Sequence, residues 1–224
     1  MNRVKKLPAR KKTALRRGAI CLLLAAACVG MGGYGLLPRR GIYYSEENVN
    51  MGRTSVIRSL GSIPMKKTGL NRLYLCANDN GMLMALTRFY FLYGWLDYGF
   101  HALDCSHSAP VHIGAYSISR TYGEEEYERI WYLYGRVDEP DAASLQISIG
   151  YHDEKDAWVS IEKLELPEVE WLEAEGRTYF VRELPEMDIW NYDYPIEVMA
   201  ELTDTQGNLL HQQEVTQSGG TSLG

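Results

Sequence analysis

Three of the five histidines in this 224-residue chain lie within residues 101–112, beside an aspartate and a cysteine. Imidazole, carboxylate and thiolate are ligands that zinc and similar metals accept, and a cysteine with a histidine can act as a nucleophile. The candidate metal ligands are His101, Asp104, His107 and His112, and the candidate nucleophile is Cys105 with His101 or His107. If this stretch is a strand, residues 101, 105 and 107 share one face.

The spacing of these residues matches no motif with a known mechanism. The chain contains no His-Glu-x-x-His pair, no Cys-x-x-Cys pair, no phosphate loop, no dinucleotide glycine motif and no Gly-x-Ser-x-Gly elbow. We therefore expect a strand followed by a loop with solvent-facing histidines, and a protein without catalytic activity or cofactor. A metal-dependent or Cys-based surface enzyme that uses residues 101–112 is the alternative.

Cys105 has one other possible role, in a disulfide. Cys76 and Cys105 are the only cysteines outside the N-terminal apolar segment. If this part of the chain is exported to an oxidising compartment, the two are candidates for a bridge. Two buried free thiols are the alternative, because unpaired cysteine is often buried in a core.

Export is predicted by residues 18–37, GAICLLLAAACVGMGGYGLL, which contain no charged side chain. A helix of twenty residues is about 30 Å long, close to the thickness of the hydrocarbon core of a bilayer. Eight cations and no acids precede it, and only Arg39 and Arg40 follow it closely. Because basic residues stay on the cytoplasmic side, residues 1–17 are predicted to be a cytoplasmic tail and residues 41–224 to lie outside. The expected location is the cell membrane, with a single span.

Two further interpretations of the apolar segment remain open. The small residues 25–27 could be the cleavage site of a signal peptide, or Cys28 could be the lipidated residue of a lipoprotein. The length of the apolar run favours an anchor, whereas its four late glycines weaken a helix there. All three interpretations export the rest of the chain.

The charge distribution limits the partners. Ten of the 23 cations and none of the 29 acids lie in the first forty residues, which leaves a net charge of −16 for residues 41–224. The basic tail suits anionic lipid headgroups, and an acidic exported part is repelled by nucleic acid. The predicted partners are therefore the bilayer, through residues 18–37, and an unknown protein or surface ligand. No Asn-x-Ser/Thr sequon occurs, which favours a bacterial surface protein over a secreted glycoprotein.

The exported part divides by pattern into a linker and two β lobes. Residues 38–70 contain frequent glycines and are predicted to be a linker. Residues 71–120 form an aromatic-rich lobe that begins with a hairpin, in which two apolar runs flank a turn at residues 78–81. The second run, residues 82–93, is predicted to be a central strand buried on both faces, with an aromatic ligand cleft as the alternative. Its neighbouring charges, Arg88 and Asp97, argue against a second membrane span.

An acidic stretch at residues 121–127 is interpreted as the boundary between the lobes. Residues 127–216 then show short alternating segments with turn residues between them, a pattern typical of an all-β sandwich. The predicted strands are residues 130–137, 144–150, 157–164, 169–174, 178–184, 196–202 and 209–215. Residues 217–224 are rich in serine and glycine and are expected to be disordered.

Two stretches carry a family resemblance. They are LYGRVDEPDAASLQISIG, residues 133–150, and AELTDTQGNLLHQQEV, residues 200–215. With their Gly-Arg-Val strand and their Asp-x-x-Gly turn before the last strand, they resemble the immunoglobulin-like sandwiches of single-span bacterial surface proteins. The resemblance covers about residues 127–216 and implies a sandwich fold, but it supplies no catalytic residues.

Overall fold

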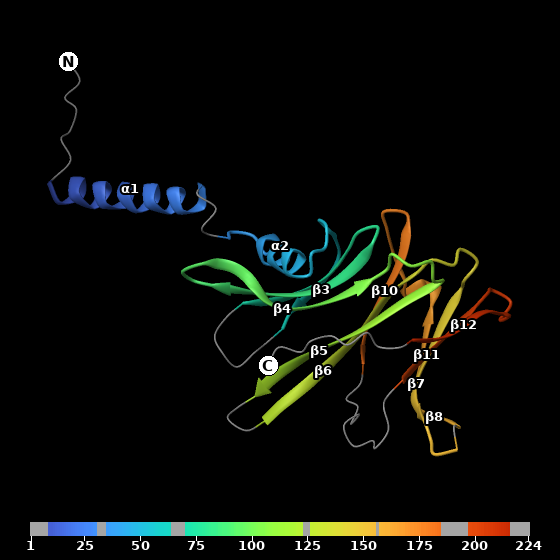
Figure 1. Cartoon of the computed structure of the whole chain (residues 1–224). Helices are drawn as coiled ribbons and strands as arrows, with labels where there is room; N and C mark the ends of the chain where they lie inside the picture. The colour runs from blue at the N-terminus through green and yellow to red at the C-terminus, as the bar shows by residue number, and fades with distance from the viewer. Residues whose placement is uncertain are drawn as a thin grey trace.

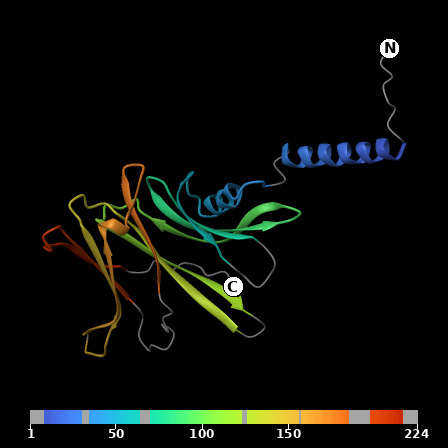
Figure 2. The ribbon, with the colours of Figure 1, turned by 180° about the vertical axis from the view of Figure 1, so that it is seen from behind.

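The part of the chain that the structure describes forms an all-β body with two helices at its N-terminal end (Figures 1 and 2). The computed structural model describes residues 9–30, 35–63, 70–122, 126–155, 157–184 and 197–215. In these residues twelve strands form three antiparallel sheets of four strands each. The predicted all-β class is therefore confirmed.

Sheet A contains the first four strands in sequence order: β1 (Ser55–Ser62), β2 (Asn71–Ala77), β3 (Gly81–Tyr90) and β4 (Gly94–Asp104). The hairpin predicted around residues 78–81 is confirmed, with Ala77 opposite Met82. The Asn78 side chain closes this turn, because its oxygen accepts hydrogen bonds of 2.9 Å from the backbone N–H groups of Asn80 and Gly81.

The predicted strand over residues 82–93 ends earlier than expected. β3 is buried from Gly81 to Arg88, as a central strand should be, but the chain turns at residues 91–93 and returns as β4. Gly94 permits this reversal because it adopts a φ of +77°, in the left-handed region that favours glycine. The second half of the aromatic run therefore forms the tip of a second hairpin.

Residues 38–70 are not a linker, because they contain β1 and the helix α2 (Arg39–Asn48). The helix packs on the outer face of sheet A, where Ile42 contacts a cluster that includes Tyr74 and Cys76. Its Glu46 is fully buried, pairs with Arg39 and Arg53, and accepts hydrogen bonds from the backbone and hydroxyl of Thr54 at 2.9 and 2.6 Å. A buried charge needs such partners, so this network fixes the segment to the sheet.

Sheets B and C form the C-terminal half. Sheet B has the order β5-β6-β10-β9, and its strands are β5 (Val111–Tyr122), β6 (Glu126–Val137), β10 (Arg177–Leu184) and β9 (Leu172–Ala174). Sheet C has the order β12-β11-β7-β8, and its strands are β12 (Leu209–Val215), β11 (Glu197–Thr203), β7 (Ser144–His152) and β8 (Trp158–Pro167). A short 3₁₀ turn, η1 (Glu168–Glu170), follows β8. The strands predicted after residue 127 are confirmed within a few residues, except that residues 168–170 form η1 rather than part of a strand.

The lobe boundary expected at residues 121–127 lies inside sheet B instead. β5 pairs with β6 along its whole length, from Val111 opposite Val137 to Tyr122 opposite Glu126. β5 therefore belongs with the strands of the second lobe, and residues 121–127 include the end of β5 and the start of β6.

Sheet B is the middle layer of the molecule. Along β6, Tyr132 and Tyr134 face sheet A, whereas Leu133 and Val137 face sheet C, as the alternation of a strand requires. Among the described residues, each of the two resulting cores contains fourteen buried side chains. Because the cores are of equal size, sheet A is a full layer of the fold and not an appendage to the sandwich.

Gly135 shows how tightly this middle layer is packed. A Cβ at this position would lie against the carbonyl oxygen of His112 and 2.5 Å from the ring of Phe180. Real Cβ atoms do not approach other atoms so closely, so only glycine fits here.

The first helix, α1 (Ala9–Gly30), lies apart from the sheets in both views (Figures 1 and 2). Within the described residues, no helix meets the length and hydropathy needed to cross a membrane. The predicted span over residues 18–37 is thus not confirmed, since α1 ends at Gly30 and Gly35 is already paired with Gly94. The predicted disordered tail and residues 31–34 lie outside the described residues, as does the side chain of Cys28.

Candidate functional site

Residues 101–112 cover the end of β4, a loop and the start of β5. The expected strand followed by a loop is confirmed, and the chain then re-enters a strand at Val111. The histidines, however, are distributed over three different environments.

His101 lies between sheets A and B. Its Nδ1 is 2.7 Å from the hydroxyl oxygen of Tyr134, and its ring stacks on Tyr116. Burial lowers the pKa of His101 below its usual value, because the charged imidazolium would lose its hydration. A half-buried imidazole engaged by a tyrosine is a satisfied structural residue, contrary to the expectation of a solvent-facing one.

Asp104 and His107 lie on the surface, as expected. His107 Nε2 is 3.7 Å from an Asp104 carboxylate oxygen, and both side chains are exposed. The backbone N–H of Ser106 donates a hydrogen bond of 2.9 Å to Asp104, and this bond is the main cause of the lowered pKa of that carboxyl. The carboxylate therefore serves to shape the loop.

His112 is buried beside two charged groups. Its Nε2 lies 3.5 Å from an Asp138 oxygen and makes no hydrogen bond to any described atom. Burial is the main cause of its lowered pKa, and the neighbouring Arg136 guanidinium lowers the pKa further. His112 is opposite Arg136 in the register of β5 and β6, which explains their contact.

The predicted metal set is therefore not assembled. Over the part of the chain that the structure describes, no three histidine, cysteine, aspartate or glutamate side chains are placed to hold a metal ion. Cys105 is buried, and burial raises the pKa of its thiol to about 12. A nucleophilic cysteine needs a lowered pKa, so this environment opposes the thiolate.

The Cys76–Cys105 bridge is not formed, and both residues are free thiols. The physical reason is the alternation of β2. Leu75 and Ala77 face the core between sheets A and B, where Cys105 lies, whereas Cys76 points to the opposite face, under α2. The two sulfur atoms are therefore separated by sheet A itself.

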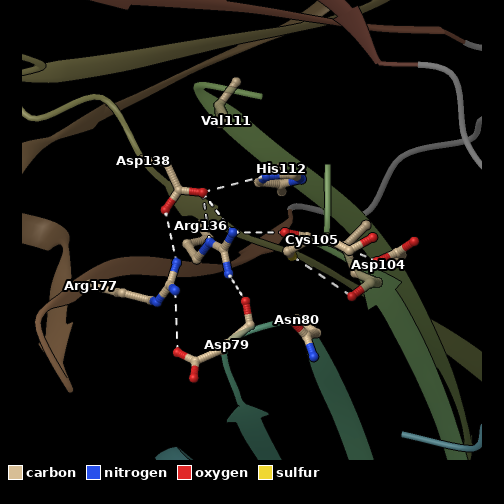
Figure 3. Close-up of polar contacts among 12 residues, drawn as sticks. Asp79, Asn80, Asp104, Cys105, Val111, His112, Arg136, Asp138 and Arg177 are labelled. Atoms are coloured by element: carbon tan, nitrogen blue, oxygen red, sulfur yellow. Dashed lines mark hydrogen bonds and ion pairs between the residues drawn. The ribbon is translucent and has the colours of Figure 1, made fainter. Parts of the chain in front are cut away.

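Arg136, which no sequence motif indicated, lies at the centre of this region (Figure 3). It is only 3% exposed. Its Nε and Nη2 lie 2.8 and 2.7 Å from one oxygen of Asp138, Nη2 donates to the carbonyl oxygen of Cys105 at 2.9 Å, and Nη1 donates to that of Asp79 at 3.2 Å. One guanidinium thus connects β6 to two separate loops of sheet A.

Arg177 extends the same network toward the solvent. Its Nη1 is 3.6 Å from the second oxygen of Asp138, and its Nη2 is 3.2 Å from Asp79 (Figure 3). Two guanidinium groups therefore hold Asp138 from both sides. We name Arg136, Asp138, Arg177 and Asp79 the arginine clamp.

Two surface hollows meet at the arginine clamp. The larger has a volume of about 1030 Å³ and the smaller about 560 Å³. The larger, which we name the acidic groove, lies among the loops that join the sheets at this end. Its wall contains the exposed Val169, the half-buried Trp171 and six carboxylate residues: Asp79, Asp138, Glu139, Glu168, Glu173 and Glu175.

Comparisons of the chain with protein-family models, with curated proteins and with solved structures found no match. The role of the site is therefore argued from its geometry. An acidic concave surface with an aromatic and an aliphatic side chain can bind a basic, partly apolar segment, because carboxylates pair with cations while Trp171 covers apolar stems.

Proposed function

We propose that this protein is a non-catalytic module, held at the outer face of the cell membrane by its N-terminal segment, that binds a basic segment of a partner protein in the acidic groove. The groove is the observation that carries the proposal. Its loops come from β2–β3, β6–β7 and β8–β10, so parts of all three sheets contribute to one surface. Binding residues are commonly presented in this way, on loops held by a rigid scaffold.

The membrane attachment is supported by α1. Its large apolar side chains Leu15, Ile20, Leu22, Leu23 and Leu24 are all more than half exposed. Apolar surface of this size is unfavourable in water, whereas lipid would cover it. The cations on its N-terminal side favour a cytoplasmic N-terminus, with the sheets outside.

An immunoglobulin-like architecture for sheets B and C is supported by their strand order. If β5 to β12 are lettered A, B, C, C′, D, E, F and G in turn, sheet B has the order ABED and sheet C has the order GFCC′. This is the arrangement of immunoglobulin-type sandwiches. The closed B–C core, with Ile147, Phe180 and Leu202 fully buried, fits such a sandwich.

The enzyme alternative has no specific support in this geometry. His101 is engaged by Tyr134, and Cys105 is a buried thiol with a raised pKa. The polar groups around Cys105 are engaged in the arginine clamp, which connects sheets rather than presenting reactive atoms to a substrate.

A defined ligand tests the groove. A fluorescent peptide of alternating lysine and leucine should bind the full chain in proteoliposomes, with an affinity that falls as salt rises. Glu173→Gln with Glu175→Gln should weaken binding. The control is Glu165→Gln with Glu214→Gln, which removes the same charge from exposed sites on sheet C and should leave binding unchanged. Equal loss of peptide affinity in both variants, or no binding by the unaltered chain, contradicts the proposal that the acidic groove binds the peptide.

Membrane attachment has its own test. A reporter enzyme fused after Gly224 should be active only outside the cytoplasm, and the full-length chain should remain in the membrane fraction after alkaline washing. Cytoplasmic activity of the reporter would contradict the orientation.

A further inference from the structure

The tip of the β3–β4 hairpin is the most apolar exposed loop of the sheets in the described part of the chain. Phe91, Leu92 and Tyr93 are 85%, 73% and 58% exposed. In Figures 1 and 2 this hairpin extends from the sheets on the side where α1 lies. Three consecutive large side chains that are mostly exposed to water form an apolar surface of the kind that lipid or a partner covers.

The tip is fixed beside the segment that follows α1. The backbone N–H of Gly35 donates to the carbonyl oxygen of Tyr93 at 3.1 Å, and the N–H of Trp95 donates to the carbonyl oxygen of Gly35 at 2.8 Å. A Cβ on Gly94 would collide with the Gly35 main chain, so a glycine is needed for this approach. The next residues, Leu36 and Leu37, are also exposed. One apolar patch is thus formed by residues 36–37 and 91–93, and we name it the apolar tip.

The charge around the apolar tip suits a lipid surface. Residues 41–224 contain 29 acids, yet none lies within residues 81–96. The single cation there, Arg88, is buried with its guanidinium 3.7 Å from the centre of the Tyr98 ring. Aromatic and leucine side chains in a stretch of chain without carboxylates are the composition favoured at the boundary between headgroups and acyl chains.

We propose that the apolar tip docks into the outer leaflet of the bilayer, at the headgroup–acyl boundary. This inference rests on the proposed membrane attachment, because α1 would deliver Gly35 to the outer surface. The segment that follows the helix and the hairpin would then meet the bilayer side by side, so two segments of the chain would hold the sheets. They are thereby fixed in orientation rather than tethered by a flexible stalk.

The experiment places an environment-sensitive probe on the tip of the full chain. Cys21 and Cys28 are replaced by alanine, while Cys76 and Cys105 are buried and remain. Leu92→Cys is labelled with a nitrobenzoxadiazole dye, and Val169→Cys, exposed on η1, is the matched control. Both proteins are reconstituted into phosphatidylcholine–phosphatidylglycerol vesicles, with and without lipids that carry a spin label near the headgroup.

The expected result is blue-shifted emission and quenching by spin-labelled lipid at position 92, with neither at position 169. If both proteins float with the vesicles and the two positions behave alike, the docking is refuted while the attachment stands. If neither protein floats with the vesicles, the attachment fails and the docking fails with it. Phe91→Ser with Tyr93→Ser in the labelled Leu92→Cys chain should remove the blue shift of the emission but not the flotation with vesicles. If the blue shift is retained, it is caused by the dye itself and not by the tip.

Discussion

Replacement of Arg136 by methionine tests whether the arginine clamp holds sheets A and B together. Methionine keeps much of the aliphatic stem but has no donors, so the change removes the charge with little loss of packing. The carboxylate of Asp138 and the carbonyl oxygens of Asp79 and Cys105 would then each lose a donor. These three groups determine the energetic cost.

The expected loss of stability in Arg136→Met follows from the burial of these partner groups. Removal of one partner from a fully buried ion pair costs about 3–5 kcal/mol. Asp138 is 28% exposed and keeps Arg177 at 3.6 Å, so the lower end applies and we expect a loss of about 3 kcal/mol. For a protein of this size, each kcal/mol shifts the thermal midpoint by about 2–4 °C, so Arg136→Met should lower it by about 6–12 °C.

The assay is urea unfolding for the free energy and thermal unfolding for the midpoint, both on the full chain in mild detergent and monitored by tryptophan fluorescence. Arg182→Met is the matched control, because Arg182 forms one ion pair with Glu170 and the two side chains are 50% and 39% exposed. Exposed pairs contribute about 0–1 kcal/mol, so this variant should be nearly unchanged. If Arg136→Met loses no more stability than Arg182→Met, the clamp does not hold the sheets and the reasoning is refuted.

Three further predictions use the same assay or a thiol titration. Burial lowers the pKa of His101 and His112, so the unfolded chain binds protons that the folded chain does not, and stability should fall as the pH decreases below about 6.5. His112→Gln should reduce that loss of stability. An unchanged dependence of stability on pH in this variant contradicts the role given to His112. Burial raises the pKa of Cys76 and Cys105 to about 12. With the α1 cysteines replaced by serine, the native chain should therefore not react with a thiol reagent at neutral pH until it is unfolded. Rapid reaction of the native chain contradicts this prediction. Gly135→Ala should lower the free energy of unfolding by about 1–3 kcal/mol or more, because its Cβ would overlap the carbonyl oxygen of His112. Stability equal to that of the unaltered chain would show that the strands can separate.

The strands after residue 127 were predictable because each carries a local signal. In β7, Leu145, Ile147 and Ile149 alternate with polar residues, and all three point into the B–C core. The turn at residues 78–81 is equally local, since Asn78 closes it with its own side chain. Such features depend on neighbours in sequence, so a pattern is enough to find them.

The linker assignment failed because α2 is stabilised by contacts with residues outside the helix. Its sequence, RRGIYYSEEN, has few apolar residues, and its stability depends on Glu46 meeting Arg53 and Thr54 beyond the helix. The lobe boundary failed for a related reason. An acidic stretch marks a break between strands, but it does not reveal whether the next strand pairs back onto the last one, as β6 does onto β5.

The candidate site was hardest to predict, because proximity in sequence is not convergence in space. His101 is half-buried between sheets A and B, whereas His107 lies exposed on a loop. Six positions apart in sequence, they lie in different environments. Arg136 carries no motif, and arginine is ordinarily exposed. Its role depends on three groups that come from separate loops, which only the register of the sheets brings together.

The strand β3 connects the two proposals. It begins at Gly81, two residues after Asp79 of the acidic groove, and ends at Tyr90, next to the apolar tip. Ten residues at about 3.4 Å each separate the two ends by roughly 30 Å. The Debye length at physiological salt is about 8 Å, so a bilayer at the tip would leave the groove beyond the field of anionic headgroups. The carboxylates of the acidic groove would then bind a basic partner without competition from the lipid surface. Variants of the apolar tip should therefore leave the affinity for the peptide unchanged. Variants of the acidic groove should leave the probe at position 92 in lipid.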